Sequence, residues 1–386
     1  MSSRVPDVLI VGGGAIGGSI ALAMASRGAS VTVLEGGRVG RGASWAAAGA
    51  LVAEWGSDDP PALTSLARDS LALWPEFAEE VQGRSGVGLN YREDGLLNLW
   101  LDPDAPALPR DLATEPPPGP GQRLTAAEVR EREPSLSGPI LGGVFDPTAA
   151  QVDNPRLAPA LLRAAADLGA SVVADTPVAG LLGDAGRCRG VRSIDGREWP
   201  AGAVVLAAGA WSGPLAAAAG IELPVVPWRG QMLTFETTTR PFQSMVFCGE
   251  LVLIPRPHGP LIVGTTLENV GFDGRVTLAG LHEILARTTR VAPGLGDLPL
   301  LRTWAGLRPG TPDGLPYLGP IPGWAGLFAA SGHGRKGIIL TPITGPLIAS
   351  LVLEGVTDPR MIPFLPGRTR DGRATEKPAS RRTSTG

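Results

Sequence analysis

Asp7-Val-Leu-Ile-Val-Gly-Gly-Gly-Ala-Ile-Gly17, near the start of the chain, decides the fold. An apolar run, a glycine turn and a small-residue stretch are followed by a second apolar run that ends at Glu35. This is the strand–turn–helix–strand–acid pattern that binds the ADP half of a dinucleotide. Gly12 permits the tight turn, Gly14 admits the pyrophosphate, and Gly17 lets the helix pack on the strand. Glu35 is expected to accept hydrogen bonds from ribose hydroxyls. The motif alone leaves FAD and NAD open.

Composition narrows the class of protein. The 386 residues suffice for one large or two ordinary domains, and 43% of them are hydrophobic. A net charge of −3 without a basic run in the body argues against nucleic-acid binding. Cys188 and Cys248 lie far apart and form neither a metal motif nor a disulfide framework, so we expect no metal and a cytoplasmic location. We expect neither a targeting segment nor a membrane span.

The order of apolar patterns predicts two domains. Strand and helix patterns alternate at the start, a block from Val225 to Thr266 predicts antiparallel strands, and a strand–helix unit returns between Leu327 and Leu353. The predicted class is α/β, with an α+β second domain. The nucleotide-binding domain is expected at 1–85, 144–222 and 303–366, the substrate domain at 86–143 and 223–302, and a disordered tail at 367–386.

Local signals place several helices. Thr125-Ala-Ala-Glu128 predicts a capping box at a helix start. Asn154-Pro155 predicts the start of a helix that runs to Gly169, although Pro159 suits a helix start better than an interior. A further helix is expected from Thr277 to Arg290, and a late one near Gly337.

Three further segments carry small residues or tight turns suited to a bulky cofactor. They are Gly40-Arg-Gly-Ala-Ser44-Trp-Ala-Ala-Ala-Gly49, Ala207-Ala-Gly-Ala-Trp-Ser212 and the stretch from Gly332 to Gly345. With Trp304-Ala-Gly-Leu-Arg-Pro-Gly-Thr-Pro-Asp-Gly-Leu-Pro-Tyr-Leu-Gly319, they resemble the FAD-dependent amine oxidases of the D-amino acid oxidase superfamily. The resemblance extends from about residue 5 to 360 and includes the bacterial glycine oxidases of thiamine biosynthesis.

The resemblance implies a Rossmann-like FAD-binding domain of the glutathione-reductase type. The FAD would be non-covalent, because no cysteine lies near Arg308 or Gly332 in the sequence. A homotetramer is also implied. The cofactor-binding residues expected from the motif and the resemblance are Gly12, Gly14, Ala15, Ile16, Gly17, Glu35, Ala43, Ser44, Ala48, Gly49, Ala50, Val178, His333, Gly334, Arg335, Lys336, Gly337, Ile338 and Ile339.

The same resemblance implies where an amino acid would bind. Arg308 occupies the position that holds the substrate carboxylate, for which a guanidinium fork is suited. Arg335 would lie beside it and favour reduced flavin. Val252 stands where glycine oxidases carry an aromatic hydroxyl, and Ala50 replaces a larger apolar residue. Both differences lead us to expect a substrate preference that extends beyond glycine to bulkier amines. Arg229 is expected to be a structural strand arginine.

The implied reaction converts a small amino acid, oxygen and water into a 2-oxo acid, ammonia or an amine, and hydrogen peroxide. Two alternatives remain open at this point. One is a D-amino acid dehydrogenase that passes electrons to a quinone. The other is a flavin-binding subunit without turnover of its own.

Overall fold

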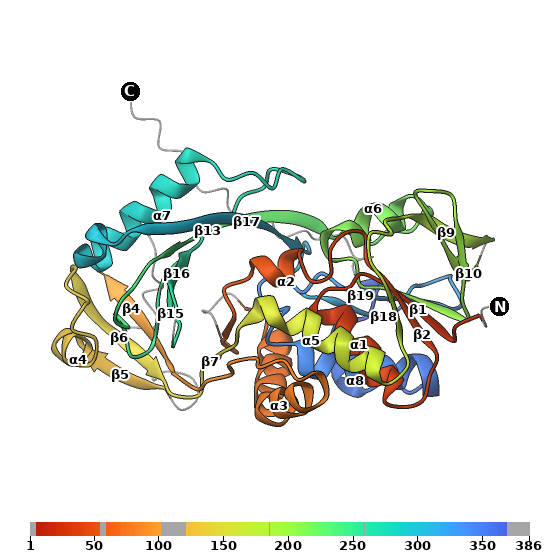
Figure 1. The fold of residues 1–386 in the computed structure, drawn as a ribbon, viewed down its shortest axis with the longest axis horizontal. Helices are drawn as coiled ribbons and strands as arrows, with labels where there is room; N and C mark the ends of the chain where they lie inside the picture. The colour runs from red at the N-terminus through yellow and green to blue at the C-terminus, as the bar shows by residue number, and fades with distance from the viewer. Residues whose placement is uncertain (1–4, 55–58, 102–120, 185, 258, 369–386) are drawn as a thin grey trace.

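The computed structural model describes residues 5–54, 59–101, 121–184, 186–257 and 259–368. Figure 1 shows two lobes side by side, with the long strands β13 and β17 arching from one lobe toward the other. One lobe is an α/β sandwich, and the other is a large, mostly antiparallel sheet with a helix on its outer face. The predicted fold class is confirmed.

The α/β lobe is built on a six-stranded sheet whose strands are parallel except for the edge strand β18. Its order is β18 (Tyr317–Pro320), β19 (Leu327–Ser331), β12 (Ala203–Leu206), β1 (Val8–Val11), β2 (Val31–Leu34) and β8 (Ser171–Val173). One apolar core joins it to α1 (Ala15–Ala25), α3 (Pro61–Ser85), α5 (Asn154–Asp167) and α8 (Thr341–Glu354). A second core joins it to α6 (Ser212–Ala217) and the sheet of β9 (Val178–Asp184), β10 (Arg187–Ser193) and β11 (Glu198–Pro200).

The second lobe is an eight-stranded sheet in which only β4 and β14 pair in parallel. Its order is β17 (Leu300–Gly310), β13 (Val226–Phe235), β16 (Leu261–Gly264), β15 (Leu251–Pro255), β14 (Met245–Cys248), β4 (Leu96–Leu101), β6 (Ile140–Asp146) and β5 (Gln122–Thr125). Its outer core is closed by α4 (Ala126–Arg132) and α7 (Leu278–Val291). Between the lobes lie α2 (Ala43–Ala46) and the short pair β3 (Ala50–Leu51) and β7 (Ala150–Gln151).

Most local predictions are confirmed. Thr125 Oγ1 accepts from the Glu128 amide at 3.3 Å, and the Glu128 carboxylate accepts from the Thr125 amide at 2.7 Å. Helix α5 begins at Asn154 as predicted but ends at Asp167, and the expectation for Pro159 was wrong, because Pro159 lies in the helix interior. The predicted start of the late helix near Gly337 was wrong. The helix begins at Thr341, because the chain from His333 first makes a glycine-containing turn.

The strands cross the expected domain limits. Strand β6 runs to Asp146, past the expected limit at 143, and strand β17 runs to Gly310, past the expected limit at 302. If each strand is assigned whole to the domain of its sheet, these two limits move to Asp146 and Gly310. The expected tail lies outside the described residues except for two. Of these, Arg368 binds Asp313 at 2.7 Å and lies over the Tyr317 ring. Among the described helices, none is both long and apolar enough to span a membrane.

Candidate functional site

A cavity of about 770 Å³ lies between the lobes. It begins where parallel strands β1, β2 and β12 end and reaches the inner face of the eight-stranded sheet. Ligands of open α/β sheets bind at this carboxyl edge. Most residues that line the cavity lie in six segments, and four lie on the second sheet or next to it. The segments are 11–16, 34–50, 176–179, 207–215, 306–309 and 330–338, and the other four residues are Gly230, Met232, Val252 and Thr265.

The glycine turn forms one end of the cavity. Gly12 has φ +112°, and a Cβ there would collide with the Ala207 carbonyl oxygen. A Cβ on Gly17 would collide with the Gly12 carbonyl oxygen. Gly12, Gly14, Ala15 and Ile16 line the cavity at the N-terminus of α1, whereas Gly17 does not. Gly17 therefore contributes the close packing expected of the third glycine.

Glu35 directly follows β2 and lies beside this turn. Its carboxylate accepts hydrogen bonds from the amides of Gly13 at 2.7 Å and Gly37 at 3.1 Å. These bonds fix the acid against the glycine turn while it lines the cavity. Val178, at the start of β9, lines the same cavity.

The segment 43–50 forms the wall between the two ends. Ser44 Oγ accepts from the Ala15 amide at 2.9 Å, which attaches α2 to the N-terminus of α1. Ala43, Ser44, Ala48, Gly49 and Ala50 all line the cavity. A Cβ on Gly49 would collide with the Val152 carbonyl oxygen, so this wall tolerates only glycine at that position.

Two side chains that the sequence analysis did not assign to the site hold this wall from behind. Asn154 Nδ2 donates to the carbonyl oxygens of Ser44, Trp45 and Ala47 at 2.8, 3.1 and 3.0 Å. Arg256 Nη2 donates to the Ala48 carbonyl oxygen at 3.0 Å. Burial lowers the pKa of Arg256 to about 10. Arg256 directly follows Pro255, the last residue of β15, and its carbonyl partners leave no pattern in the sequence.

The turn after β19 forms the floor of the cavity. His333, Gly334, Arg335, Gly337 and Ile338 line it. His333 is 3% exposed, and burial lowers its pKa to about 3, so its imidazole is neutral. Its Nε2 lies 3.4 Å from Thr344 Oγ1.

Lys336 and Ile339 belong to the same turn but do not line the cavity. Lys336 Nζ donates to the carbonyl oxygens of Val52 and Ala53 at 3.1 and 3.0 Å and pairs with Asp59 at 2.8 Å. The Ile339 carbonyl accepts from Ser70 and Trp74. Both residues support the turn from its far side.

Arg308 projects from β17 into the other end of the cavity. Its Nη2 donates to Thr265 Oγ1 at 2.7 Å, and its Nη1 donates to the Thr266 carbonyl oxygen at 3.2 Å. Burial lowers its pKa to about 10, so it remains a cation. Within the described part of the chain, no carboxylate lies within ion-pair distance of Arg308. A partly buried cation without such a partner is suited to bind an anionic group of a ligand.

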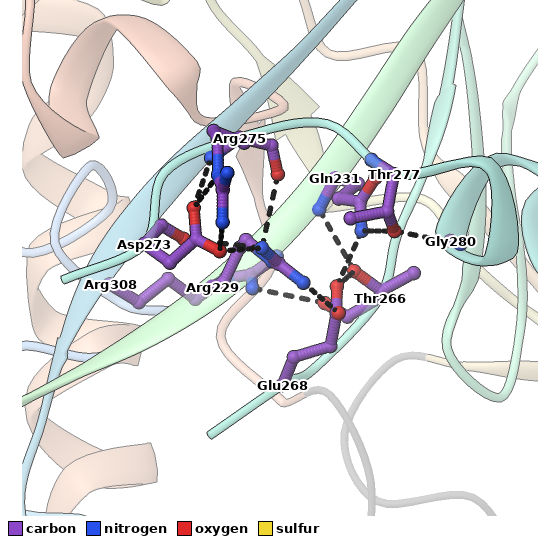
Figure 2. Close-up of polar contacts among 9 residues, drawn as sticks. All are labelled: Arg229, Gln231, Thr266, Glu268, Asp273, Arg275, Thr277, Gly280 and Arg308. Carbon is purple, nitrogen blue, oxygen red and sulfur yellow. Dashed lines mark hydrogen bonds and ion pairs between the residues drawn. The ribbon is translucent and has the colours of Figure 1, made fainter. Parts of the chain in front are cut away.

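A polar network behind Arg308 fixes these partners (Figure 2). Thr266 Oγ1 donates to Glu268 at 2.6 Å and accepts from the Gln231 amide at 3.0 Å. Glu268 also accepts from Arg229 at 2.5 Å and from the Gln231 side chain at 2.8 Å. Burial would raise the pKa of Glu268, but bonds from Arg229, Thr266 and Gln231 lower it below its usual value.

Arg229 is the structural strand arginine that the sequence predicted. It is 4% exposed, and it pairs with Asp273 at 3.3 Å as well as with Glu268. The network continues through Gln231, whose side chain accepts from the Thr277 amide at 2.8 Å, to the N-terminus of α7.

The remaining predicted substrate residues line the same cavity as Arg308. Arg335 Nη2 contacts both carboxylate oxygens of Glu250 at 2.8 Å. Val252 on β15 and Ala50 on β3 line the cavity as apolar walls. Neither Cys188 nor Cys248 lines it. The structure thus brings Arg308, Arg335, Val252 and Ala50 into one cavity with the glycine turn.

Comparison with known proteins agrees with this arrangement. The model of a family described as FAD dependent oxidoreductase matches residues 7–351. The chain is 38% identical to glycine oxidase of Geobacillus kaustophilus over 93% of this chain and 96% of that protein. It is 35% identical to the bifunctional protein ThiO/ThiG of Trichormus variabilis, over 93% of this chain but 54% of that longer protein. The crystal structure of glycine oxidase from Geobacillus kaustophilus superposes with a TM-score of 0.87, at 36% identity, over 95% of this chain and 99% of that one.

Proposed function

Since the chain belongs to the family of FAD-dependent oxidoreductases, we propose that it oxidises glycine and other small amino acids at the cavity beside Arg308. Glycine, oxygen and water give glyoxylate, ammonia and hydrogen peroxide, and we assign the step to thiamine thiazole biosynthesis. The observation that carries the proposal is Arg308, a partly buried cation at one end of a dinucleotide-sized cavity and without a carboxylate within ion-pair distance among the described residues.

The cavity has the features that FAD requires. Gly12 and Gly14 leave room for phosphates at the N-terminus of α1, and Glu35 is fixed where a ribose would lie. The wall 43–50, Val178 and the turn 333–338 would hold the rest of the cofactor, which needs no covalent link. When bound, FAD supplies the acceptor for two electrons from the substrate.

The chain's own residues bind, orient and desolvate the substrate. Arg308 would hold the carboxylate through its fork, and Thr265 and Thr266 fix the direction of that fork. Val252 and Ala50 give the reacting carbon an apolar surround that excludes water. A neutral His333 with a pKa of about 3 is too weak a base to hold a proton, so its role is to position the turn.

One experiment separates this proposal from its alternatives. The holoenzyme is mixed with glycine without oxygen, the flavin absorbance is followed, and air is then admitted. Bleaching followed by stoichiometric peroxide supports the oxidase. Bleaching without peroxide would establish a dehydrogenase that needs another acceptor. Unchanged absorbance with a panel of small amino acids would establish a subunit without turnover.

We further propose that the protein works as a cytoplasmic homotetramer. The support is the resemblance to bacterial glycine oxidases, together with two cysteines that form no disulfide. Light scattering of the purified holoenzyme tests the assembly, and a mass of one or two chains would contradict it.

A further inference from the structure

Glu250 does not itself line the cavity but lies in the turn that joins β14 to β15, two residues before Val252, which does. The Glu250 carbonyl accepts from the Thr265 amide at 3.0 Å, and Thr265 Oγ1 accepts from Arg308. Glu250 and the proposed carboxylate anchor Arg308 are therefore both hydrogen-bonded to the same residue, Thr265.

The Glu250 side chain neutralises a second arginine of this cavity. Both of its carboxylate oxygens lie 2.8 Å from Arg335 Nη2, and Arg335 lines the cavity. Arg308 and Arg335 are close enough for each charge to be felt by the other, since Arg335 contributes to the lowered pKa of Arg308 after burial itself. The Arg335–Glu250 pair adds no net charge, and Arg308 adds one positive charge. The net charge of these three side chains is thus +1, which one substrate carboxylate would neutralise.

We propose that Glu250 determines specificity: by occupying Arg335 it makes the site select amino acids with one carboxylate over those with two. The inference rests on the proposed amino acid oxidation and names its substrate class. A second substrate carboxylate would meet a guanidinium whose partner is already in place, and it would lie beside the Glu250 charge. Like-charge juxtaposition of this kind is how binding sites reject a wrong ligand.

The Arg335–Glu250 ion pair can be altered without unfolding the protein. The side chains of Arg335 and Glu250 are 25% and 35% exposed, and ion pairs with this much solvent contribute little to stability. Glu250→Gln keeps the size and a hydrogen-bonding oxygen but removes the charge. The substitution thus removes the negative charge that would oppose a second carboxylate beside Arg335.

The kinetic test uses two substrates of the same size. N-Ethylglycine and iminodiacetate are both secondary amines, and the second carries a carboxylate where the first has a methyl group. In Glu250→Gln the ratio of kcat/KM for iminodiacetate over N-ethylglycine should rise roughly tenfold or more, because one opposing charge is lost. Glu198→Gln is the matched control, since Glu198 pairs with Arg192 at 2.7 Å on the three-stranded sheet, and Arg192, unlike Arg335, does not line the cavity.

A double variant and a binding assay complete the test. Glu250→Gln/Arg335→Gln should lose the gain, because the second cation is gone. Glutarate and pentanoate, which are not amines, are titrated into each holoenzyme and followed by flavin absorbance, so this arm needs no turnover. Glu250→Gln should favour glutarate over pentanoate more than the wild type does.

The outcomes separate the two proposals. Unchanged ratios in Glu250→Gln, with normal glycine oxidation, would overturn the role of Glu250 alone. Absence of glycine oxidation in the wild type would overturn the proposed function, while the glutarate arm would still decide the role of Glu250. A gain that persists in the double variant would also overturn it, because Arg335 would not be the receiving group.

Discussion

At the scale of single residues, Arg308 is the strongest test of the site. Arg308→Ala removes the cation and leaves Thr265 and the Thr266 carbonyl facing the cavity. Losing one partner of a buried charged pair costs about 2–5 kcal/mol, which is roughly 30- to several-thousand-fold in kcat/KM. Steady-state oxidation of glycine measures it, and most of the loss should be in KM.

Arg308→Lys distinguishes charge from geometry. It keeps the cation but not the fork, so it should recover part of the loss and not all of it. Retained flavin absorbance in both variants is the control for folding and cofactor binding. Glycine oxidation by Arg308→Ala at the wild-type KM would show that another group holds the carboxylate.

His333 predicts a pH dependence of stability. Burial lowers its pKa from 6.5 in the unfolded chain to about 3 in the folded one. Above pH 6.5 neither state binds this proton, so the free energy of unfolding is unaffected. As the pH falls from 6.5 toward 3, the unfolded state takes up the proton and the folded state does not, so stability falls.

The measurement is urea unfolding of the holoenzyme at several pH values from 7 to 4. His333→Gln should lose less stability on acidification than the wild type, because it lacks the imidazole. His282→Gln, at an exposed position on α7, is the control and should follow the wild type. The same acid dependence in His333→Gln and the wild type would rule out this group as a cause.

At the scale of elements, sequence reasoning succeeded where an element carries its own signal. The glycine turn, the capping box at Thr125 and the antiparallel block after Val225 each follow from local chemistry. The start of α8 was missed because the apolar residues from Ile338 continue smoothly through the turn into the helix. Asn154 and Arg256 were missed because their partners are carbonyl oxygens, which every residue possesses.

The loop that joins β16 to α7 carries the next prediction. Glu268 and Asp273 both pair with Arg229, but only Glu268 reaches Thr266 and through it Arg308. Glu268→Gln should therefore weaken substrate binding, with a KM raised about three- to tenfold from the loss of roughly one hydrogen bond. Asp273→Asn also removes an anion from Arg229 and is the matched control.

The comparison requires kcat and KM for glycine and the unfolding midpoint of both variants. Each should lose a similar amount of stability, because each leaves Arg229 with one carboxylate. A KM that rises equally in both variants would mean that the network acts through general stability and does not position Arg308.

At the scale of the whole molecule, the site depends on two lobes with separate apolar cores. The glycine turn and Glu35 belong to the α/β lobe, whereas Arg308 and Val252 belong to the eight-stranded sheet. Their chemistry could be read from motifs, but the cavity between them arises only when strands β13 and β17 bring the second sheet over the first lobe (Figure 1). No local pattern encodes that placement.

This arrangement makes the cofactor a link between lobes. A ligand present at a hundred times its dissociation constant adds about 2.7 kcal/mol to the state that binds it. FAD in this cavity would contact both lobes, so it stabilises their docked arrangement in particular. We expect calorimetry of the holoenzyme to show one unfolding transition, and the apoprotein to show a lower and broader one that separates into two. Adding FAD should restore the single transition. ADP, which can bind only at the glycine turn, should raise the α/β transition alone; a single apoprotein transition that ADP shifts as a whole would contradict independent lobes.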